Sequence, residues 1–457
     1  MTQTEKAIAQ NDVAPKPTLT VIDAVAVIVG VVIGSGIFKT PSLVAANSGS
    51  QTAFLVFWMI AGVVSFIGAL CYAELASAYP HTGGEYFYIK RAFGQRISFL
   101  YGWARLTIIQ TGSIAVVSFV FGDYVSQIYS LGRYSSSIYA GLAIVLLTWL
   151  HSRNIHQGTF VQNLLAAAKV LGLICVIAAG LSFVTNTSGA NQTEVKTSFS
   201  PALALVFALF TYGGWSEVSY VTAEMKDVQR NIPKALFLGI GILTFVYVLA
   251  NVAYLKGLGL EGVISSDTVA ADLMRRVVGE YGAKFISVLI AIATLGSASA
   301  SIFTGARTNY AVGQNFSLFS FVGKWDERTN TPRRALVFQC VVALLLVFLG
   351  SGTRDGFKTL VIYTTPAYWF FLIMTGVSLI VLRFKDRNLE RPFNVPLYPL
   401  TPFLFSATCA FVLTSTVIYA YGVFIETSSK VALMGIAVLL IGVPLMFLGT
   451  FKTESVR

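Results

Sequence analysis

Long apolar runs separated by short polar segments occupy most of the chain. A run of roughly 20 apolar residues is enough to cross a bilayer as a helix. We therefore predict an all-α polytopic membrane protein with twelve transmembrane helices. The predicted spans cover approximately residues 21–46, 52–78, 98–122, 137–150, 159–184, 199–224, 234–256, 283–313, 334–350, 358–382, 399–424 and 431–450.

The composition supports this class and predicts an orientation. The 457 residues are 55% hydrophobic and only 12% charged, whereas a soluble protein carries roughly twice that share of charge. The net charge is +11, and with the N-terminus inside 19 Lys and Arg fall on the inner side and 9 on the outer side. Because positive charge favours cytoplasmic loops, both termini are predicted to be cytoplasmic. The expected location is the plasma membrane, which is the inner membrane if the source is bacterial.

The two ends of the chain and its cysteines carry little chemistry. Residues 1–20 are polar and predicted to be a disordered cytoplasmic N-terminus, and residues 451–457 a cytoplasmic C-terminus. Four cysteines lie singly inside apolar runs, with no spacing typical of a metal site. We expect no metal, cofactor or nucleic-acid partner. The cysteines are Cys71, Cys175, Cys340 and Cys409.

The first apolar run is interrupted at its midpoint by Gly34, Ser35 and Gly36. Glycine costs about 1 kcal/mol relative to alanine inside a helix, so this stretch suits an unwound backbone. Unwound backbone inside a membrane survives where protein or water satisfies it. A helix that restarts at Ile37 would point free N–H groups into the gap, which suits a carboxylate. The alternative is a continuous helix with a small packing face.

A second midpoint interruption, Gly213-Gly214, falls five spans later. Paired breaks at corresponding positions of two halves indicate an inverted-repeat transporter with its site at the membrane midplane. We predict a first repeat at 21–184, a second at 199–382, and two appended spans at 399–450. Free N–H groups hold a carboxylate and free carbonyl groups hold an ammonium, so a zwitterionic amino acid would satisfy both.

Cations inside the spans are candidates for function. Lys169 lies about 15 Å into the fifth span, where a lysine is costly and functional by default; packing by a salt bridge is the alternative. Arg105, nearer a membrane face, is expected to snorkel. Ser299 belongs to a small-residue stretch that favours close helix packing; the functional reading is a hydroxyl that meets Lys169 where another carrier would bind sodium. Residues 86–97 predict an interfacial helix, and 257–282 a long outer loop.

Several stretches, taken in order, give the chain a resemblance to the amino acid–polyamine–organocation superfamily over nearly its whole length, closest in pattern to L-type-like bacterial amino acid exchangers. The matching stretches are Gly34-Ser35-Gly36-Ile37-Phe38, Tyr79-Pro80-His81-Thr82-Gly83-Gly84-Glu85-Tyr86, Tyr212-Gly213-Gly214-Trp215, Glu224-Met225-Lys226, Arg230-Asn231-Ile232-Pro233 and Arg391-Pro392-Phe393-Asn394-Val395-Pro396-Leu397-Tyr398-Pro399.

The resemblance implies a LeuT-type 5+5 inverted repeat with discontinuous helices 1 and 6. It implies that Phe210 closes over the substrate as a gate, and that Lys169 replaces a sodium ion and ties helix one to helix eight through a residue such as Ser299. The implied substrate-binding residues are Val32, Ile33, Ser35, Gly36, Ile37, Phe210, Tyr212, Gly213 and Gly214.

The chain departs from the resembled pattern at Glu217, which either selects a basic substrate or lies on a face away from the pocket. The sequence after Arg307 also differs from the usual acidic turn. The loop around 123–136 lacks a cysteine for bridging to a heavy-chain partner, so we expect no obligatory heavy-chain subunit.

These observations predict a sodium-independent amino acid transporter that works by alternating access in the lipid bilayer. Neutral L-amino acids carried by exchange or proton symport are favoured. One alternative is a cationic amino acid or polyamine carrier with Glu217 as counter-charge, and another is a membrane sensor that binds without transport. A membrane enzyme is disfavoured because His81, His151 and His156 all fall at cytoplasmic ends of spans.

Overall fold

The computed structural model describes residues 19–81, 83–153, 159–182, 199–353, 355–427 and 430–448. Within these ranges the regular structure is helical, and β-type pairing is limited to isolated bridges. The helices are α2 (Val21–Val32), α3 (Gly36–Ala46), α4 (Gln51–Ala78), α5 (Gly84–Phe93), α6 (Gln95–Ala104), η1 (Arg105–Ile109), α7 (Gln110–Ser126), α8 (Ser135–Ser152), α9 (Thr159–Ser182), α10 (Pro201–Tyr212), η2 (Trp215–Glu224), α11 (Val228–Ile264), α12 (Val269–Val278), α13 (Glu280–Asn315), η3 (Ser317–Phe319), α14 (Arg333–Ser351), α15 (Gly356–Lys385), α16 (Leu400–Thr427) and α17 (Val431–Leu448).

The helices are long and apolar enough to make this a polytopic membrane protein. Among the described residues, nine helices could each cross a membrane, and the bent pair α2 and α3 could form a tenth span. Shorter apolar helices occupy Ala167–Ser182 and Leu433–Phe447. The all-helical membrane class predicted from the sequence is therefore confirmed.

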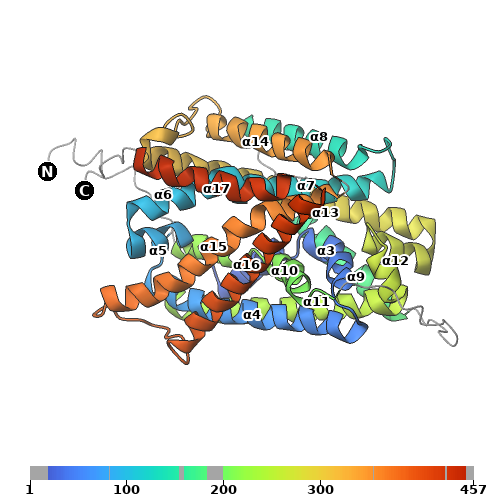
Figure 1. Cartoon of the computed structure of the whole chain (residues 1–457), viewed down its shortest axis with the longest axis horizontal. Coiled ribbons are helices and arrows are strands. Elements are labelled where there is room, and N and C mark those ends of the chain that lie inside the picture. Colours follow the sequence, from blue (N-terminus) through green and yellow to red (C-terminus); the bar gives the residue numbers. More distant parts are fainter. Residues whose placement is uncertain are drawn as a thin grey trace.

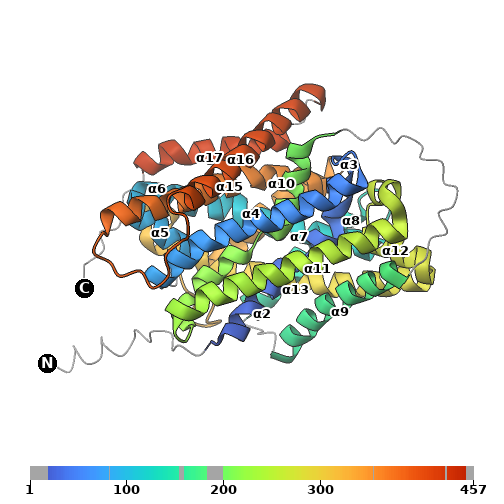
Figure 2. The same ribbon diagram turned by 90° about the horizontal axis from the view of Figure 1, so that it is seen from below.

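The bundle has two opposite ends, which we name after the helices that lie there. The α5 end carries α5 and the start of α6, and the α12 end carries α12 (Figure 1). Helix α11 packs along α4, α2 and α9, and α13 packs along α7 and α9. Turning the molecule shows α4 and α11 crossing it side by side between these ends (Figure 2).

Two connections differ from the sequence prediction. The helix expected over 86–97 runs from Gly84 to Phe93 and stops because Gly94 adopts a φ of +86°, which favours glycine. The segment 257–282, expected to be a loop, continues α11 past a kink at Gly259 and then forms α12. At the N-terminal edge, Leu19 pairs with Met225, so the predicted disordered segment is ordered at its end; residues 1–18 lie outside the described residues.

Candidate functional site

The first break separates α2 from α3 as the glycine pattern predicts. Helix α2 ends at Val32, Gly34 N–H bonds to the Val32 carbonyl at 2.7 Å, and α3 begins at Gly36 with its axis bent by 54°. The first N–H groups of a helix have no acceptor within that helix. The amides of Ser35, Gly36 and Ile37 thus lie where a carboxylate could be bound.

The second break separates α10 from η2 and depends on one glycine conformation. Gly213 N–H bonds to the Phe210 carbonyl at 3.0 Å, and Gly214 adopts a φ of +105°. A residue with a side chain would be strained there. The chain then continues as a 3₁₀ helix rather than an α-helix, so this span too is discontinuous.

The two breaks touch each other closely. A Cβ atom at Gly36 would lie 2.9 Å from the Thr211 side chain, and the hydroxyls of Thr40 and Thr211 are 2.5 Å apart. On the other side, a Cβ atom at Gly214 would lie 3.0 Å from Val31. Glycine is thus required at these contacts, and the breaks form one site built by two helices.

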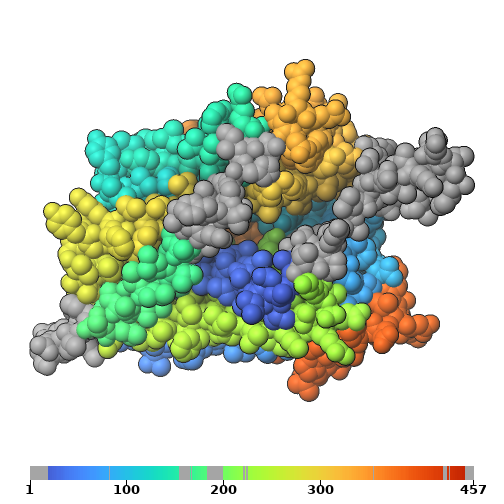
Figure 3. All heavy atoms as spheres, turned by 180° about the vertical axis from the view of Figure 1, so that it is seen from behind, coloured from blue at the N-terminus to red at the C-terminus, as the bar shows by residue number. Residues whose placement is uncertain are grey.

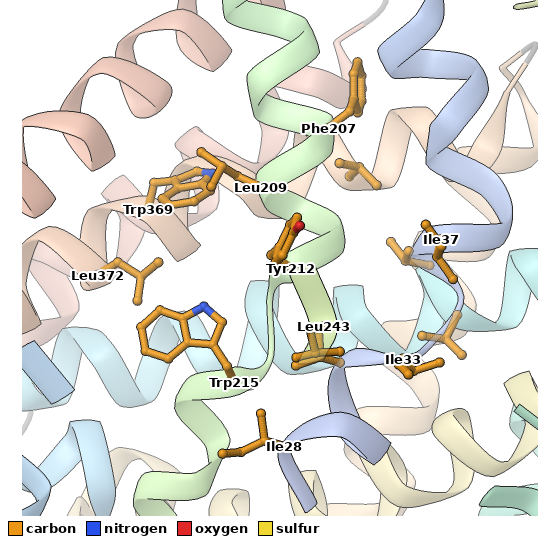
Figure 4. Close-up of a cluster of buried hydrophobic side chains, with 14 of the residues drawn as sticks. Ile28, Ile33, Ile37, Phe207, Leu209, Tyr212, Trp215, Leu243, Trp369 and Leu372 are labelled. Atoms are coloured by element: carbon orange, nitrogen blue, oxygen red, sulfur yellow. The ribbon is translucent and has the colours of Figure 1, made fainter. Parts of the chain in front are cut away.

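The side chains near the breaks are mostly packed in the core. Ile33 and Ile37 lie on the broken helix α2–α3, and Tyr212 lies on α10 opposite them (Figure 4). The Tyr212 hydroxyl donates to the Trp58 carbonyl at 3.1 Å, so this side chain points into the packing against α4 and not into the gap. Phe210, the predicted gate, is partly buried with its ring against Phe357.

The two residues predicted to replace a sodium ion make separate contacts. Lys169 Nζ donates to the Gly30 carbonyl of α2 at 3.0 Å, which ties α9 to the first broken helix. Ser299 Oγ lies 2.9 Å from His151 Nε2 on α8. The tie to helix one is therefore present, while the contact of Ser299 with His151 joins α13 to α8. His156 lies outside the described residues.

Arg105 is buried and paired, and the expectation that it snorkels is wrong. It is 4% exposed, and its Nη2 atom lies 3.3 Å from Glu217 Oε1 on η2. It also donates to the Tyr101 hydroxyl at 3.1 Å and to Gln110 Oε1 at 3.3 Å. Arg105 begins η1, a π-helical turn, a feature common at functional sites. The Glu217 carboxylate thus stabilises the charge of Arg105 inside the protein, so the side chain does not need to reach water.

The α12 end of the site is closed by another buried cation. Lys39 of α3 is 2.8 Å from Asp123 Oδ2 of α7 and donates to the Asp267 carbonyl at 3.0 Å. The Lys39 and Asp123 side chains are 6% and 17% exposed. Three elements are thus joined over this end of the broken helices.

Sequence reasoning missed the hydroxyl groups that hold the breaks. Tyr247 of α11 donates at 2.7 Å to the carbonyl of Val32, one of the implied substrate-binding residues, and approaches Thr211 O at 3.5 Å. A carbonyl oxygen has two lone pairs, and the Val32 carbonyl already accepts from Gly34 N–H and from Tyr247, so both of its lone pairs are occupied. A tyrosine in an apolar span was the one available signal, and nothing in the sequence paired it with Val32.

The chain is similar to known amino acid transporters. It is 32% identical to mouse Large neutral amino acids transporter small subunit 2 over 462 residues, which cover 98% of this chain and 84% of that protein. The human protein of the same name is 33% identical, covering 96% and 81%. Mouse b(0,+)-type amino acid transporter 1 is 32% identical, covering 82% and 78%.

One predicted absence is corrected by these relatives. We expected no obligatory heavy-chain subunit because the loop at 123–136 lacks a cysteine. That expectation is contradicted, because relatives that match 96% and 98% of this chain are named small subunits. The inference failed because a disulfide is only one way to hold subunits together; a packed surface of sufficient area does so without one.

The family assignment rests on nearly the whole chain. The family described as "Amino acid permease" matches residues 19–444, which include both breaks and the ion pairs described above. The relatives are transporters and not enzymes, and the apolar helices make this chain a membrane-spanning protein. The resemblance stated from the motifs is confirmed, and the chain belongs to the amino acid permease family.

Proposed function

We propose that the protein is a sodium-independent secondary transporter of neutral L-amino acids that works by alternating access. The observation that carries the proposal is the pair of facing breaks, with the first-turn amides of α3 beside the end of α10. The amides suit a carboxylate, and carbonyls near Ile33 and Phe210 suit an ammonium. These groups are common to all α-amino acids, so side-chain selection lies elsewhere.

The charge of Glu217 supports a neutral substrate. Its carboxylate is already beside the Arg105 guanidinium, at 3.3 Å and 3.4 Å to the two oxygens. A basic side chain would have to displace Arg105, which is buried and would lose that partner. Leaving a buried charge unpaired is costly, so the structure favours neutral over cationic substrates.

Lys169 supports independence from sodium. Its ammonium group donates to a backbone carbonyl of α2 beside the first break. A monovalent cation fixed to the protein at this position takes the electrostatic place of a bound sodium ion. Transport would then be driven by exchange or by co-transported protons.

The topology of the proposal follows the repeat. Twelve spans form a LeuT-type 5+5 inverted repeat at 21–184 and 199–382 followed by two spans at 399–450. The α5 end faces the cytoplasm with both termini, and the protein resides in the plasma membrane. The Lys and Arg bias of the loops supports this orientation.

Uptake into purified proteoliposomes tests the proposal. Radiolabelled amino acid is offered under an inward sodium gradient, an inward proton gradient, internal unlabelled amino acid, or none of these. Uptake that needs internal amino acid establishes exchange, and uptake that needs protons establishes symport. Sodium dependence would overturn the role of Lys169, and binding without uptake would make the protein a sensor.

A further inference from the structure

Lys39, Arg105, Lys169 and Arg307 lie within the predicted spans and away from their ends, and one of these cations differs from the others. Lys39 and Arg105 are paired with carboxylates, and Lys169 donates to a backbone carbonyl. Arg307 of α13 is exposed and has no ion pair with any residue in the described part of the chain. Its guanidinium lies over the Phe303 ring, 3.4 Å from the centroid, and donates to the Phe303 carbonyl at 3.4 Å.

Arg307 belongs to a polar exposed face of α13. Residues three or four apart in a helix share one face, and the exposed residues of α13 change both face and character along the helix. Near the α12 end the exposed residues are Tyr281, Phe285 and Val288, which suit lipid. Further along, the exposed or partly exposed face consists of Ser297, Ala300, Thr304, Arg307, Ala311 and Gln314.

This polar face starts at the first break. The position that a Cβ atom would take at Gly34 lies 3.9 Å from Ser297 Oγ. Ten residues on, Arg307 lies about 15 Å from Ser297 along the axis, in the direction of the α5 end. On this side of the molecule, dark blue atoms of the first broken helix also reach the surface between α9 and α11 (Figure 3).

The chemistry of the face suits an anion. A guanidinium stays protonated and presents N–H groups in a fork that matches a carboxylate. Stacking on Phe303 fixes the plane of the Arg307 guanidinium, which lowers the entropy lost when a ligand binds. The hydroxyl of Thr304, about one turn before Arg307, and that of Thr308, the next residue, each donate to a carbonyl of their own helix and can accept from a ligand.

We propose that Arg307 and the polar face of α13 form a second, weaker carboxylate-binding site, which captures the carboxylate of an amino acid between the broken helices and the α5 end. The site deepens the proposed function, since its occupant is the same substrate on its way to or from the cytoplasm. It also predicts that this side admits anionic ligands more readily than cationic ones.

Thiol labelling tests the site without requiring transport. In a background where the four native cysteines are replaced by serine, Thr304→Cys is treated in proteoliposomes with anionic and with cationic methanethiosulfonates. We expect both reagents to label the introduced cysteine. When each labelling rate is divided by that reagent's rate with a small free thiol, the anionic reagent should be the faster one. Arg307→Gln should lower that anionic preference about fivefold, because a nearby cation concentrates anions. Arg334→Gln, an exposed arginine at the same end, is the matched control and should change it less than about twofold.

Transport then tests the occupant. Arg307→Gln should raise the apparent KM for a neutral amino acid at the α5 side about tenfold, leave the KM at the other side unchanged, and leave an amino acid amide unaffected. Unlabelled Thr304→Cys, or labelling indifferent to Arg307, would overturn the site whether or not the protein transports. Normal labelling with charge preference but no amino acid flux would refute the proposed function while retaining an anion site at Arg307.

Discussion

The two halves of the first broken helix, α2 and α3, differ in burial, and the difference is the opposite of what their composition suggests. Helix α2 is almost entirely apolar, yet only three of its twelve residues are buried. Helix α3 contains Lys39, Thr40 and Ser42, and nearly all of it is buried. Each polar side chain of α3 has a protein partner: Asp123, Thr211 and its own backbone, respectively.

The comparison teaches that burial in this molecule follows from partners and not from hydrophobicity. Polar groups away from water are stable only when they are hydrogen-bonded, so the α12 end is closed by matched pairs. At the α5 end the exposed groups, including Arg307 and a Glu217 side chain that is 39% exposed, retain access to solvent or ligand. The α5 end also holds specific ion pairs, such as Arg383 with the buried Glu74, so the two ends differ in their exposed groups and not in the presence of contacts.

The largest effect is expected from breaking the lock at the α12 end. Lys39→Met removes the cation and leaves Asp123 buried without its partner, which costs about 3–5 kcal/mol for a buried pair. We expect a lower unfolding temperature in detergent and greater thiol labelling at the α12 side. The double variant Lys39→Met/Asp123→Asn should recover most of the loss. If the single variant were as stable as wild type, the pair would not be what closes this end.

The next largest effect is expected from adding one methyl group to α3, compared with adding one to α2. Gly36→Ala places a Cβ atom 2.9 Å from Thr211, and overpacking costs about 1–3 kcal/mol. Since the contact lies at the site, uptake should fall about tenfold. Gly30→Ala is the control in α2, where a Cβ atom meets no other atom within 4 Å. Equal uptake by the two variants would contradict the close contact of α3 with α10.

The sequence predicted the elements of this comparison better than their contacts. Glycines at 34, 36, 213 and 214 mark both breaks, because few other residues permit an unwound or left-handed backbone there. Apolar runs predict the spans, because length and hydropathy suffice for that. Partners such as Lys39 with Asp123 lie 84 positions apart in the chain, and no local pattern pairs them. For the same reason Arg105 was assigned to the membrane surface when its partner is on η2.

A smaller effect is expected at the pair between Arg105 and Glu217. The nitrogen–oxygen distances of 3.3 Å and 3.4 Å are long for a charge-assisted bond. In Glu217→Gln an amide oxygen can still accept from Arg105, which also keeps Tyr101 and Gln110, so this variant should cost only about 1 kcal/mol. Uptake of a neutral amino acid into proteoliposomes should change less than about threefold. Comparison of the double variant Arg105→Gln/Glu217→Gln with the two single variants gives the coupling free energy between these side chains. Selective loss of basic amino acid uptake in Glu217→Gln would instead favour a cationic carrier.

The smallest effect belongs to the surface of the α5 end, where Asp386 follows α15. A hydrogen bond from Arg91 at 2.7 Å holds the pKa of the Asp386 carboxyl below its ordinary value of 3.8. Because this pKa is lowered by folding, its stabilisation is present at neutral pH and is lost as the pH falls below 3.8 through the folded-state pKa. Asp386→Asn should therefore lower the unfolding free energy by less than about 1 kcal/mol at pH 7, and the difference from wild type should shrink toward pH 3. Glu390→Gln, an exposed carboxylate nearby, serves as the control. A difference that grew on acidification would mean that Asp386 is stabilised in its protonated form, and that its ion pair with Arg91 is not what stabilises this part of the α5 end.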